Sequence, residues 1–210
     1  MPVLLGALSF VTGCGKSDDE SDKSLPKTGS VPVIKHAFTD WEPNPEWRPL
    51  MTQTVDAGPY QFSLTNEFQP VEPSRKVPES MKLFVWKGHS KDGSPPPVLT
   101  VAVWLRDPRL LGEATKDLRR LLMDFTAGNT DSMGINRSGF PALQTGPIGG
   151  IEFSRARWIG MNKDRVKVAG ATYGAVDGTN LIAIIALGFG PDADASLKML
   201  ESFITSLKKK

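Results

Sequence analysis

The stretch DGTNLIAIIAL, residues 177–187, decides the fold of this chain. Asp177-Gly178 is typical of a two-residue hairpin turn, because glycine readily adopts the positive φ that such a turn needs. The residues from Leu181 to Leu187 are all apolar, so a strand here must bury both of its faces. We therefore predict a hairpin whose second strand lies at the centre of a sheet, with a helix or another layer on each side.

The segments next to this stretch extend the sheet and end it with a helix. Residues 151–159 and 165–175 predict two strands that precede the hairpin turn. A helix is predicted to begin at Pro191-Asp192. Its apolar stripe comprises Leu197, Leu200, Ile204 and Leu207. Residues 208–210 are lysines, and we expect them to stabilise the C-terminus of this helix through its dipole.

Further upstream, the sequence predicts more strands and a second helix. Alternating apolar residues predict a short strand at residues 60–64 and a hairpin formed by residues 81–87 and 98–105. Residues 113–127 predict an amphipathic helix that ends at Gly128-Asn129. The apolar stripe of this helix includes Leu121, Leu122 and Phe125. Strands and helices in this order predict an α+β domain with mainly antiparallel pairing.

The N-terminus resembles the signal peptide of a bacterial lipoprotein. A short apolar run at residues 3–10 leads to the small Gly13, to Cys14 and then to a charged stretch. We expect removal of residues 1–13 and attachment of a lipid to the thiol of Cys14. The run is too short to span a bilayer. A secretory signal opens with a positively charged segment, but no Lys or Arg precedes Lys16, so either the true start lies upstream or the signal is weak. The alternative to a signal peptide is an apolar core strand followed by a chance cysteine.

Residues 14–50 are predicted to be a flexible tether, and residues 51–210 a globular domain. The first part of the tether is charged and poor in apolar residues, so it cannot bury enough surface to offset the entropy of ordering. Prolines favour an extended second part. There, Trp41 and Trp47 either contact a partner or the bilayer, or form a strap on the protein's own domain. We expect removal of the whole tether, up to about residue 50, to leave the thermal stability of the domain nearly unchanged.

Three stretches of the domain are similar to the PsbP/Mog1-like family. They are the strand at residues 60–64, the strand at 98–105 with its following helix, and residues 149–153 with the final hairpin and helix. The resemblance implies a three-layer α/β/α sandwich around a mainly antiparallel sheet. It also implies an accessory or binding protein without a shared catalytic set, and several bacterial members of the family are lipoproteins.

Residues that could carry chemistry are few. The chain has 2 His and 1 Cys, which are His36, His89 and Cys14, so we expect no metal site, no cofactor and no catalytic triad. The net charge of +2 argues against a dedicated nucleic-acid binder. Arg155 and Arg157 are the remaining candidates, since their spacing places them on one face of a strand unless a bulge shifts the register. They could bind a carboxylate or phosphate, or they could pair with a nearby Asp or Glu.

The sequence thus favours a lipid-anchored protein of the cell envelope, held to the outer or cytoplasmic membrane with its domain outside the cytoplasm. Its expected role is non-catalytic binding of an envelope protein or a small ligand. An envelope enzyme that acts through a carboxylate or arginine pocket is the alternative, and a purely structural protein is a third interpretation.

Overall fold

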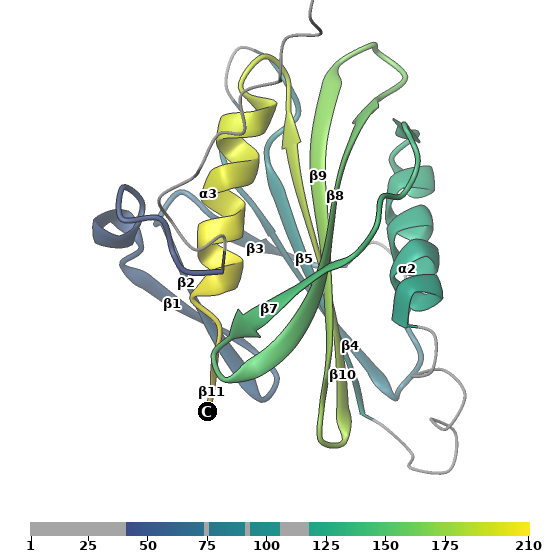
Figure 1. Cartoon of the computed structure of the whole chain (residues 1–210). Coiled ribbons are helices and arrows are strands. Elements are labelled where there is room, and N and C mark those ends of the chain that lie inside the picture. The colour runs from purple at the N-terminus through teal and green to yellow at the C-terminus, as the bar shows by residue number, and fades with distance from the viewer. Residues whose placement is uncertain (1–40, 74–75, 91–92, 106–117) are drawn as a thin grey trace, which may run out of the picture. The chain divides into compact units, whose positions relative to one another are not determined.

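The computed structural model describes residues 41–73, 76–90, 93–105 and 118–210 (Figure 1). Within these ranges the helices are the short 3₁₀ helix η1 (Arg48–Leu50), α2 (Leu118–Ser132) and α3 (Ala193–Thr205). The strands are β1 (Gln53–Ala57), β2 (Tyr60–Leu64), β3 (Gln69–Val71), β4 (Met81–Lys87), β5 (Val98–Leu105), β6 (Asn136–Arg137), β7 (Gln144–Ile148), β8 (Ile151–Met161), β9 (Lys167–Asp177), β10 (Asn180–Phe189) and β11 (Lys208–Lys209). The strands predicted at residues 60–64, 81–87 and 98–105 are confirmed with these bounds.

The larger of two sheets has eight strands in the described part of the chain. Their order is β3-β4-β5-β10-β9-β8-β6, and β7 also pairs with β8 (Figure 1). All of its strand pairs are antiparallel. β10 lies in the middle between β5 and β9, which confirms the central strand predicted from residues 177–187. The β9–β10 hairpin turns at Gly178, whose φ of 54° matches the predicted turn chemistry.

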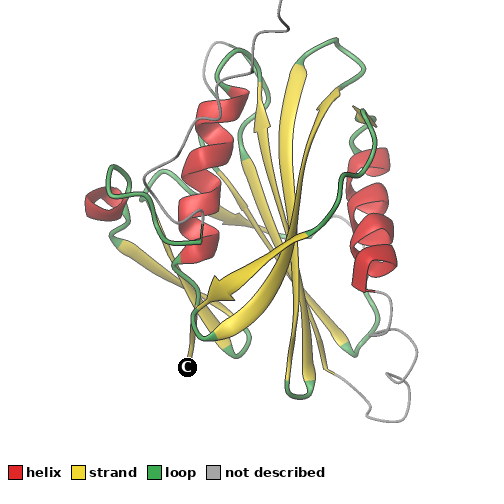
Figure 2. Ribbon diagram, in the orientation of Figure 1, coloured by secondary structure: helices red, strands yellow, loops and turns green. Residues whose placement is uncertain are grey.

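The strand β10 separates two buried clusters. Alternate side chains of a strand point to opposite faces of its sheet. One cluster contains Ile182, Ile184 and Ala186 together with residues of α3. The other contains Ala183, Ile185 and Leu187 together with residues of α2. The two helices therefore pack against opposite faces of the large sheet, and Figure 2 shows its strands between them.

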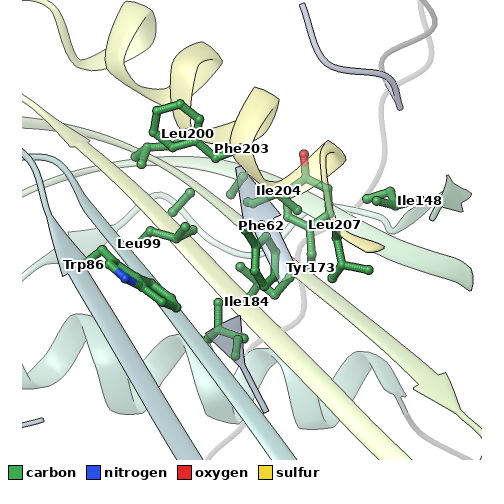
Figure 3. Packing of buried hydrophobic residues seen from close by; sticks show 14 of the residues in the cluster. Phe62, Trp86, Leu99, Ile148, Tyr173, Ile184, Leu200, Phe203, Ile204 and Leu207 are labelled. Carbon is green, nitrogen blue, oxygen red and sulfur yellow. The ribbon is translucent and has the colours of Figure 1, made fainter. Parts of the chain in front are cut away.

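On the α3 face, the helix packs its apolar stripe onto the sheet. Leu200, Phe203 and Ile204 belong to the same buried cluster as Ile184 and Tyr173 (Figure 3). A second sheet, of order β1-β2-β11, adds further apolar side chains to the same cluster. These side chains include Tyr60, Phe62 and Leu64. The strand at residues 60–64 thus belongs to this smaller sheet and not to the central one.

On the α2 face, the helix lies close to the backbone of β9. A Cβ atom placed on Gly174 would lie 2.5 Å from Cδ2 of Leu122, so glycine at this position lets the helix approach. Leu122 and Phe125 are buried, and Leu121 packs against the same cluster. The hydroxyl groups of Thr126 and Thr172 are 2.8 Å apart and link helix to strand. The predicted apolar stripe of this helix is therefore confirmed.

The end of α2 differs from the prediction. The predicted stop at Gly128-Asn129 is wrong, because the helix continues to Ser132. The Asn129 side chain donates to the carbonyl of Phe125 at 2.7 Å, so this amide bonds back onto its own helix and does not end it. The left-handed residue that follows the helix is Gly134, with φ of 64°. The predicted beginning of this helix, residues 113–117, lies outside the described residues.

The C-terminal lysines do not lie at the end of α3, where they would stabilise the helix through its dipole. The helix ends at Thr205, and Lys208–Lys209 form β11, which pairs with Gln61 and Tyr60 of β2. Lys209 forms an ion pair with Asp177, and Lys210 with Asp56 at 2.9 Å. The prediction that these cations stabilise the helix end is wrong, since the chain turns away and uses them to hold the small sheet.

Residues 41–47, called the strap from here on, lie on the domain. Trp41 and Trp47 are partly buried and pack against the cluster on the α3 face. The backbone N–H of Asn44 donates to Oγ of Ser202 at 3.3 Å, so the strap crosses α3. Of the two interpretations of these tryptophans, the structure agrees with a strap that packs on the protein's own domain. The extended conformation predicted for the second part of the tether is wrong, because the N–H groups of Trp47 and Arg48 donate to the carbonyl of Asn44 and η1 follows this turn. Residues 14–40 of the predicted tether lie outside the described residues.

Candidate functional site

Arg155 and Arg157 lie on the same face of β8, as their spacing predicts. Residues 153–161 of β8 pair with β9 without interruption, so no bulge shifts the register. Arg155 is opposite Tyr173, and Arg157 is opposite Ala171. Their burial differs, because 1% of the Arg155 side chain is exposed and 42% of the Arg157 side chain. The pair therefore combines a buried guanidinium group with one at the surface.

Glu201 of α3 joins the two arginines. Arg157 donates from Nε to Oε1 of Glu201 at 2.7 Å and from Nη2 to Oε2 at 2.9 Å, which is a bidentate ion pair. Nη1 of Arg155 lies 3.9 Å from Oε1 of Glu201. Nη2 of Arg155 donates to Oε1 of Gln144 at 2.7 Å. Two guanidinium groups thus share one carboxylate, and a neutral amide holds the buried one from the other side.

Tyr173 completes this buried network as a hydrogen-bond donor. Its hydroxyl donates to Oε1 of Glu201 at 2.9 Å. Burial raises the pKa of Tyr173 well above its usual value, and the negative charge of Glu201 raises it further, while Arg155 opposes the change. Tyr173 is therefore neutral at ordinary pH and serves as a donor to the carboxylate, not as a base.

The indole ring of Trp41 covers Arg155. The guanidinium carbon of Arg155 lies 4.5 Å from the centre of the Trp41 ring, within the range of a cation–π contact. The same ring meets Tyr173 edge-to-face, with centres 6.1 Å apart and planes at 86°. A ligand for Arg155 would have to displace this ring. For the buried arginine, the geometry therefore matches the second of the two predicted roles, which is pairing with an acidic residue.

Arg157 also faces an open groove. The groove has a volume of about 620 Å³ and lies between α3 and residues 138–141. Ile159, with 56% of its surface exposed, and Leu197 contribute apolar surface to it. Nε and Nη2 of Arg157 already donate to the carboxylate of Glu201. Arg157 would therefore bind an anion in this groove less specifically than a guanidinium group without such a partner would. Binding of a ligand by Arg157 stays a prediction.

A more enclosed cleft lies at the N-terminal end of α3. It has a volume of about 360 Å³. Its apolar walls include Trp47, Phe68, Pro95, Pro97, Phe189, Pro191 and Met199. Its polar groups belong to Glu67, His89, Ser94, Asp192 and Ser196. Aromatic walls with a few polar groups suit a small molecule or a side chain that combines an apolar body with one polar end.

Glycine lets the walls of this cleft approach one another. A Cβ atom on Gly88 would lie 2.9 Å from Cζ of Phe68 and from Cγ of Pro97, so a larger residue would push these two walls apart. Trp47 reaches the cleft from the strap, whereas Phe189 reaches it from the end of β10. The cleft is thus built from four separate parts of the chain, and for this reason no single sequence motif predicts it.

The remaining predicted site residues are divided between the cleft and the undescribed segment. His89 lines the cleft, while His36 and Cys14 lie outside the described residues. Within the described ranges, no three His, Cys, Asp or Glu side chains gather closely enough to hold a metal ion. In the same ranges, no helix is both long enough and apolar enough to cross a membrane.

The sequence reasoning missed Glu201, Tyr173, Gln144 and Trp41 as members of one cluster. A signal existed for Glu201, because it follows Leu197 by four residues and so falls on the apolar stripe of its helix. A charged residue on a buried stripe indicates a buried partner. Gln144 gave no such signal, since it lies in a polar, proline-rich stretch that reads as turns.

The fold is PsbP-like. The solution structure of cyanobacterial PsbP, CyanoP, from Synechocystis sp. PCC 6803 matches with a TM-score of 0.51 and 15% sequence identity, over 75% of this chain and 92% of that one. At this identity the likeness concerns the fold alone. A crystal structure from Bacteroides thetaiotaomicron matches with a TM-score of 0.43 and 8% identity, over 72% of this chain and 45% of that one, and carries no argument. Comparison with protein-family profiles and with curated protein sequences finds no match.

Proposed function

We propose that this protein is a lipid-anchored component of the cell envelope whose PsbP-like domain binds a protein or a small ligand without catalysing its conversion. A lipid on Cys14 would hold the chain to the outer or cytoplasmic membrane, with the domain outside the cytoplasm. The cleft beside His89 is the observation that carries the binding part of the proposal. The order of apolar run, Gly13 and Cys14 carries the anchoring part.

The dimensions and chemistry of the cleft support binding. Small-molecule sites in proteins span roughly 300–1,000 Å³ and are lined mainly by apolar and aromatic groups with a few polar ones. The cleft has about 360 Å³ and combines Trp47, Phe68 and Phe189 with His89. Glu67 and Asp192 are exposed and lie at its wall, where they can select the charge of an occupant.

The arginine cluster supports a role without catalysis. Its arginines pair with Glu201, Arg155 also donates to the neutral amide of Gln144, and Trp41 covers Arg155. Tyr173 is held neutral by burial. Groups arranged in this way stabilise the join between α3 and the sheet and leave no activated acid, base or nucleophile within the cluster.

We also propose that the fold is the three-layer α/β/α sandwich of PsbP/Mog1-like proteins. The positions of α2 and α3 on opposite faces and the two-sided burial of β10 support this. The small sheet beside α3 is an addition to that layer. Substitutions on the two faces of β10, given in the Discussion, test this proposal.

The anchor is tested by intact-mass spectrometry of protein extracted from membranes. The expected mature chain begins at Cys14 and carries the mass of the lipid. A Cys14→Ser variant should lose the lipid and leave the membrane fraction. A mature chain that retains Met1, or that begins beyond Cys14, contradicts the proposal.

The cleft is tested by photo-crosslinking in intact cells with the full chain. A benzoylphenylalanine in place of Ala195, which lines the cleft, should capture the bound molecule. The matched control places the same group at Met123, an exposed residue of α2, and should capture nothing. Equal capture at both positions, or none at Ala195, contradicts binding in the cleft.

The fate of the captured molecule separates binding from the alternative, an envelope enzyme that acts through a carboxylate or arginine pocket. A bound ligand or partner incubated with the full chain should be recovered with unchanged mass. A change of mass that disappears in Glu67→Gln or Asp192→Asn would instead establish the enzyme, because these are the carboxylates at the cleft.

A further inference from the structure

Three neighbouring strands form a socket for the indole ring of Trp41. Gly146 of β7 is the floor, Arg155 of β8 contributes the cation, and Tyr173 of β9 contributes an aromatic edge. A Cβ atom on Gly146 would lie 2.2 Å from Cδ2 and from Cε2 of the indole, so no side chain larger than hydrogen can coexist with the ring. Gly146 of β7 pairs regularly with Phe153 of β8, so neither a bulge nor a turn requires a glycine at this position. The space that the ring needs is therefore the evident reason for it.

The strap is held to this socket in the way that a bound peptide is held. It belongs to none of the strands that the structure describes, and its contacts with the domain include those of two tryptophan side chains and the hydrogen bond from Asn44 to Ser202. The residues that touch Trp41 lie far away in the sequence, so no local turn places the ring. Pro43 and Pro45 restrict the free segment, which lowers the entropy cost of docking.

We propose that this socket, formed by Gly146, Arg155 and Tyr173, is a recognition site for a tryptophan-bearing peptide segment, filled in this molecule by its own Trp41, and that a second copy of the chain can supply the tryptophan instead. The ligand class is a peptide that carries an indole, because the socket offers a flat floor, a cation over the ring face and an aromatic edge. The same contacts form in either arrangement, so exchange between copies costs little beyond association itself.

The intact chain favours its own strap. The short link at residues 48–52 keeps Trp41 near its socket at an effective concentration on the order of millimolar, which exceeds ordinary protein concentrations. Exchange therefore becomes measurable when the socket of one copy is emptied and the strap of another is released. The chain offers one substitution for each purpose, since Trp41→Ala empties the socket and Gly146→Ala blocks it.

The first experiment measures binding of a labelled peptide. A fluorescein-labelled peptide of residues 41–50 is added to the full chain carrying Trp41→Ala, and fluorescence anisotropy follows its binding. We expect saturable binding, with affinity at least about tenfold lower for a peptide that has Ala in place of Trp41. The double variant Trp41→Ala/Gly146→Ala should also bind at least about tenfold more weakly, because the added Cβ fills the floor that the ring needs.

The second experiment measures exchange between copies. The full chain with Gly146→Ala keeps Trp41 but blocks its own socket, so it is a donor, and the Trp41→Ala chain is an acceptor. Size-exclusion chromatography with light scattering should detect a dimer in the mixture and monomers in each variant alone. A mixture of the donor with the double variant should give no dimer.

Each outcome decides part of the proposal. If a Trp41→Ala chain that melts cooperatively fails to bind the peptide, or binds it equally well with Ala at the floor, the socket is only a packing contact and the proposal fails. If the peptide binds but the mixture stays monomeric, the second copy is excluded as the source of the tryptophan. Should Trp41→Ala not fold, Trp41→Leu, whose side chain is smaller than the indole and lacks its ring face, replaces it as the acceptor in both experiments.

Discussion

The two faces of the large sheet are built differently. The cluster beside α2 is made of apolar side chains, and the polar contacts next to it include hydroxyl and indole hydrogen bonds to Thr172. The cluster beside α3 contains both tyrosines of the chain, Tyr60 and Tyr173. Among the described residues, the buried charged side chains, Arg155 and Glu201, also lie on this face.

The difference follows from what covers each face. In the described part of the chain, α2 and the side chains of Phe140 and Leu143 cover the α2 side, and the buried cluster there contains no ionisable side chain. On the α3 side, a helix, a small sheet and the strap meet, and their junctions hold charged and titratable groups. The α3 face should therefore respond to charge and to pH, and the buried cluster of the α2 face should respond mainly to changes of volume. The following substitutions test this contrast in order of decreasing effect.

The largest expected effect is that of Glu201→Gln. The change keeps the shape of the side chain but removes the carboxylate that faces Arg155 and Arg157. Removing one partner of a buried ion pair costs about 3–5 kcal/mol, because it leaves an uncompensated buried charge. A urea titration should show this loss of unfolding free energy. Arg157→Gln is the matched control and should cost less, since this side chain is 42% exposed.

A loss below about 0.5 kcal/mol for Glu201→Gln, the range of ordinary surface substitutions, would contradict this prediction. It would mean that water reaches Arg155 and that the α3 face is not the more charge-sensitive one. The Thr126→Val change on the α2 face should show little dependence on salt or pH, because it removes a hydroxyl from a cluster without ionisable groups.

The second effect concerns the two sides of β10. Ile184 faces α3 and Ile185 faces α2, and both are fully buried. Truncation of either to alanine should cost about 2–5 kcal/mol. Denaturant titrations of the two variants check this. If either variant loses less than about 0.5 kcal/mol, that side of the strand faces solvent and the three-layer α/β/α sandwich is wrong.

The sequence predicted the parts of the fold that depend on local patterns. The apolar run of residues 181–187 and the Asp177-Gly178 turn were sufficient for the central strand, because a two-sided apolar strand has only one stable position in a sheet. The end of α2 was not predictable from Gly128-Asn129, since tertiary packing and the hydrogen bond from Asn129 to Phe125 override the local preference. The small sheet was missed because Lys208–Lys209 have no strand pattern and pair only through long-range contacts.

The site was less predictable than the fold. The spacing of Arg155 and Arg157 correctly placed both on one strand face, and an acidic partner was one of the two roles considered. The identity of Glu201 as that partner depends on how α3 crosses the sheet, which no local pattern encodes. The cleft combines residues of the strap, of two loops and of α3, so only the folded chain brings them together.

The third effect concerns the strap. The sequence alone predicts that removal of residues 14–50 leaves stability nearly unchanged, but the contacts of Trp41 with Arg155 and Tyr173 reverse that expectation for residues 41–47. Trp41→Ala should lower the unfolding free energy by about 2 kcal/mol, through loss of a desolvated cation–π contact and an aromatic pair. Thermal melts of Trp41→Ala and of the exposed control Glu42→Ala compare the two. Coincident melts would show that the strap adds nothing to the α3 face.

The smallest effect is a dependence on alkaline pH that belongs to the α3 face alone. Burial raises the pKa of Tyr173 well above its usual value, and the charge of Glu201 adds to this. Burial also raises the pKa of Tyr60, whose hydroxyl donates to Oδ2 of Asp177 at 2.9 Å. A raised pKa in the folded state means that the unfolded chain loses its proton first. The stability that these two groups contribute is therefore complete below about pH 10, the usual tyrosine pKa, and is lost as the pH rises above it.

For each tyrosine the loss of unfolding free energy should approach a slope of about 1.4 kcal/mol per pH unit at pH values above about 10. Denaturant titrations between pH 8 and pH 11 measure the slope, and absorbance of tyrosinate shows whether either ring ionises before unfolding. Lysines also titrate in this range, so the comparison is with Tyr60→Phe and Tyr173→Phe, each of which removes one phenol and should reduce the slope by its share. Tyr173→Phe also removes a donor to Glu201, which lowers stability at every pH without changing this argument, because the slope counts only protons. An unchanged slope in both variants would mean that the phenols titrate as in the unfolded chain, and the contrast between the two faces would then rest on the Arg155–Glu201 pair alone.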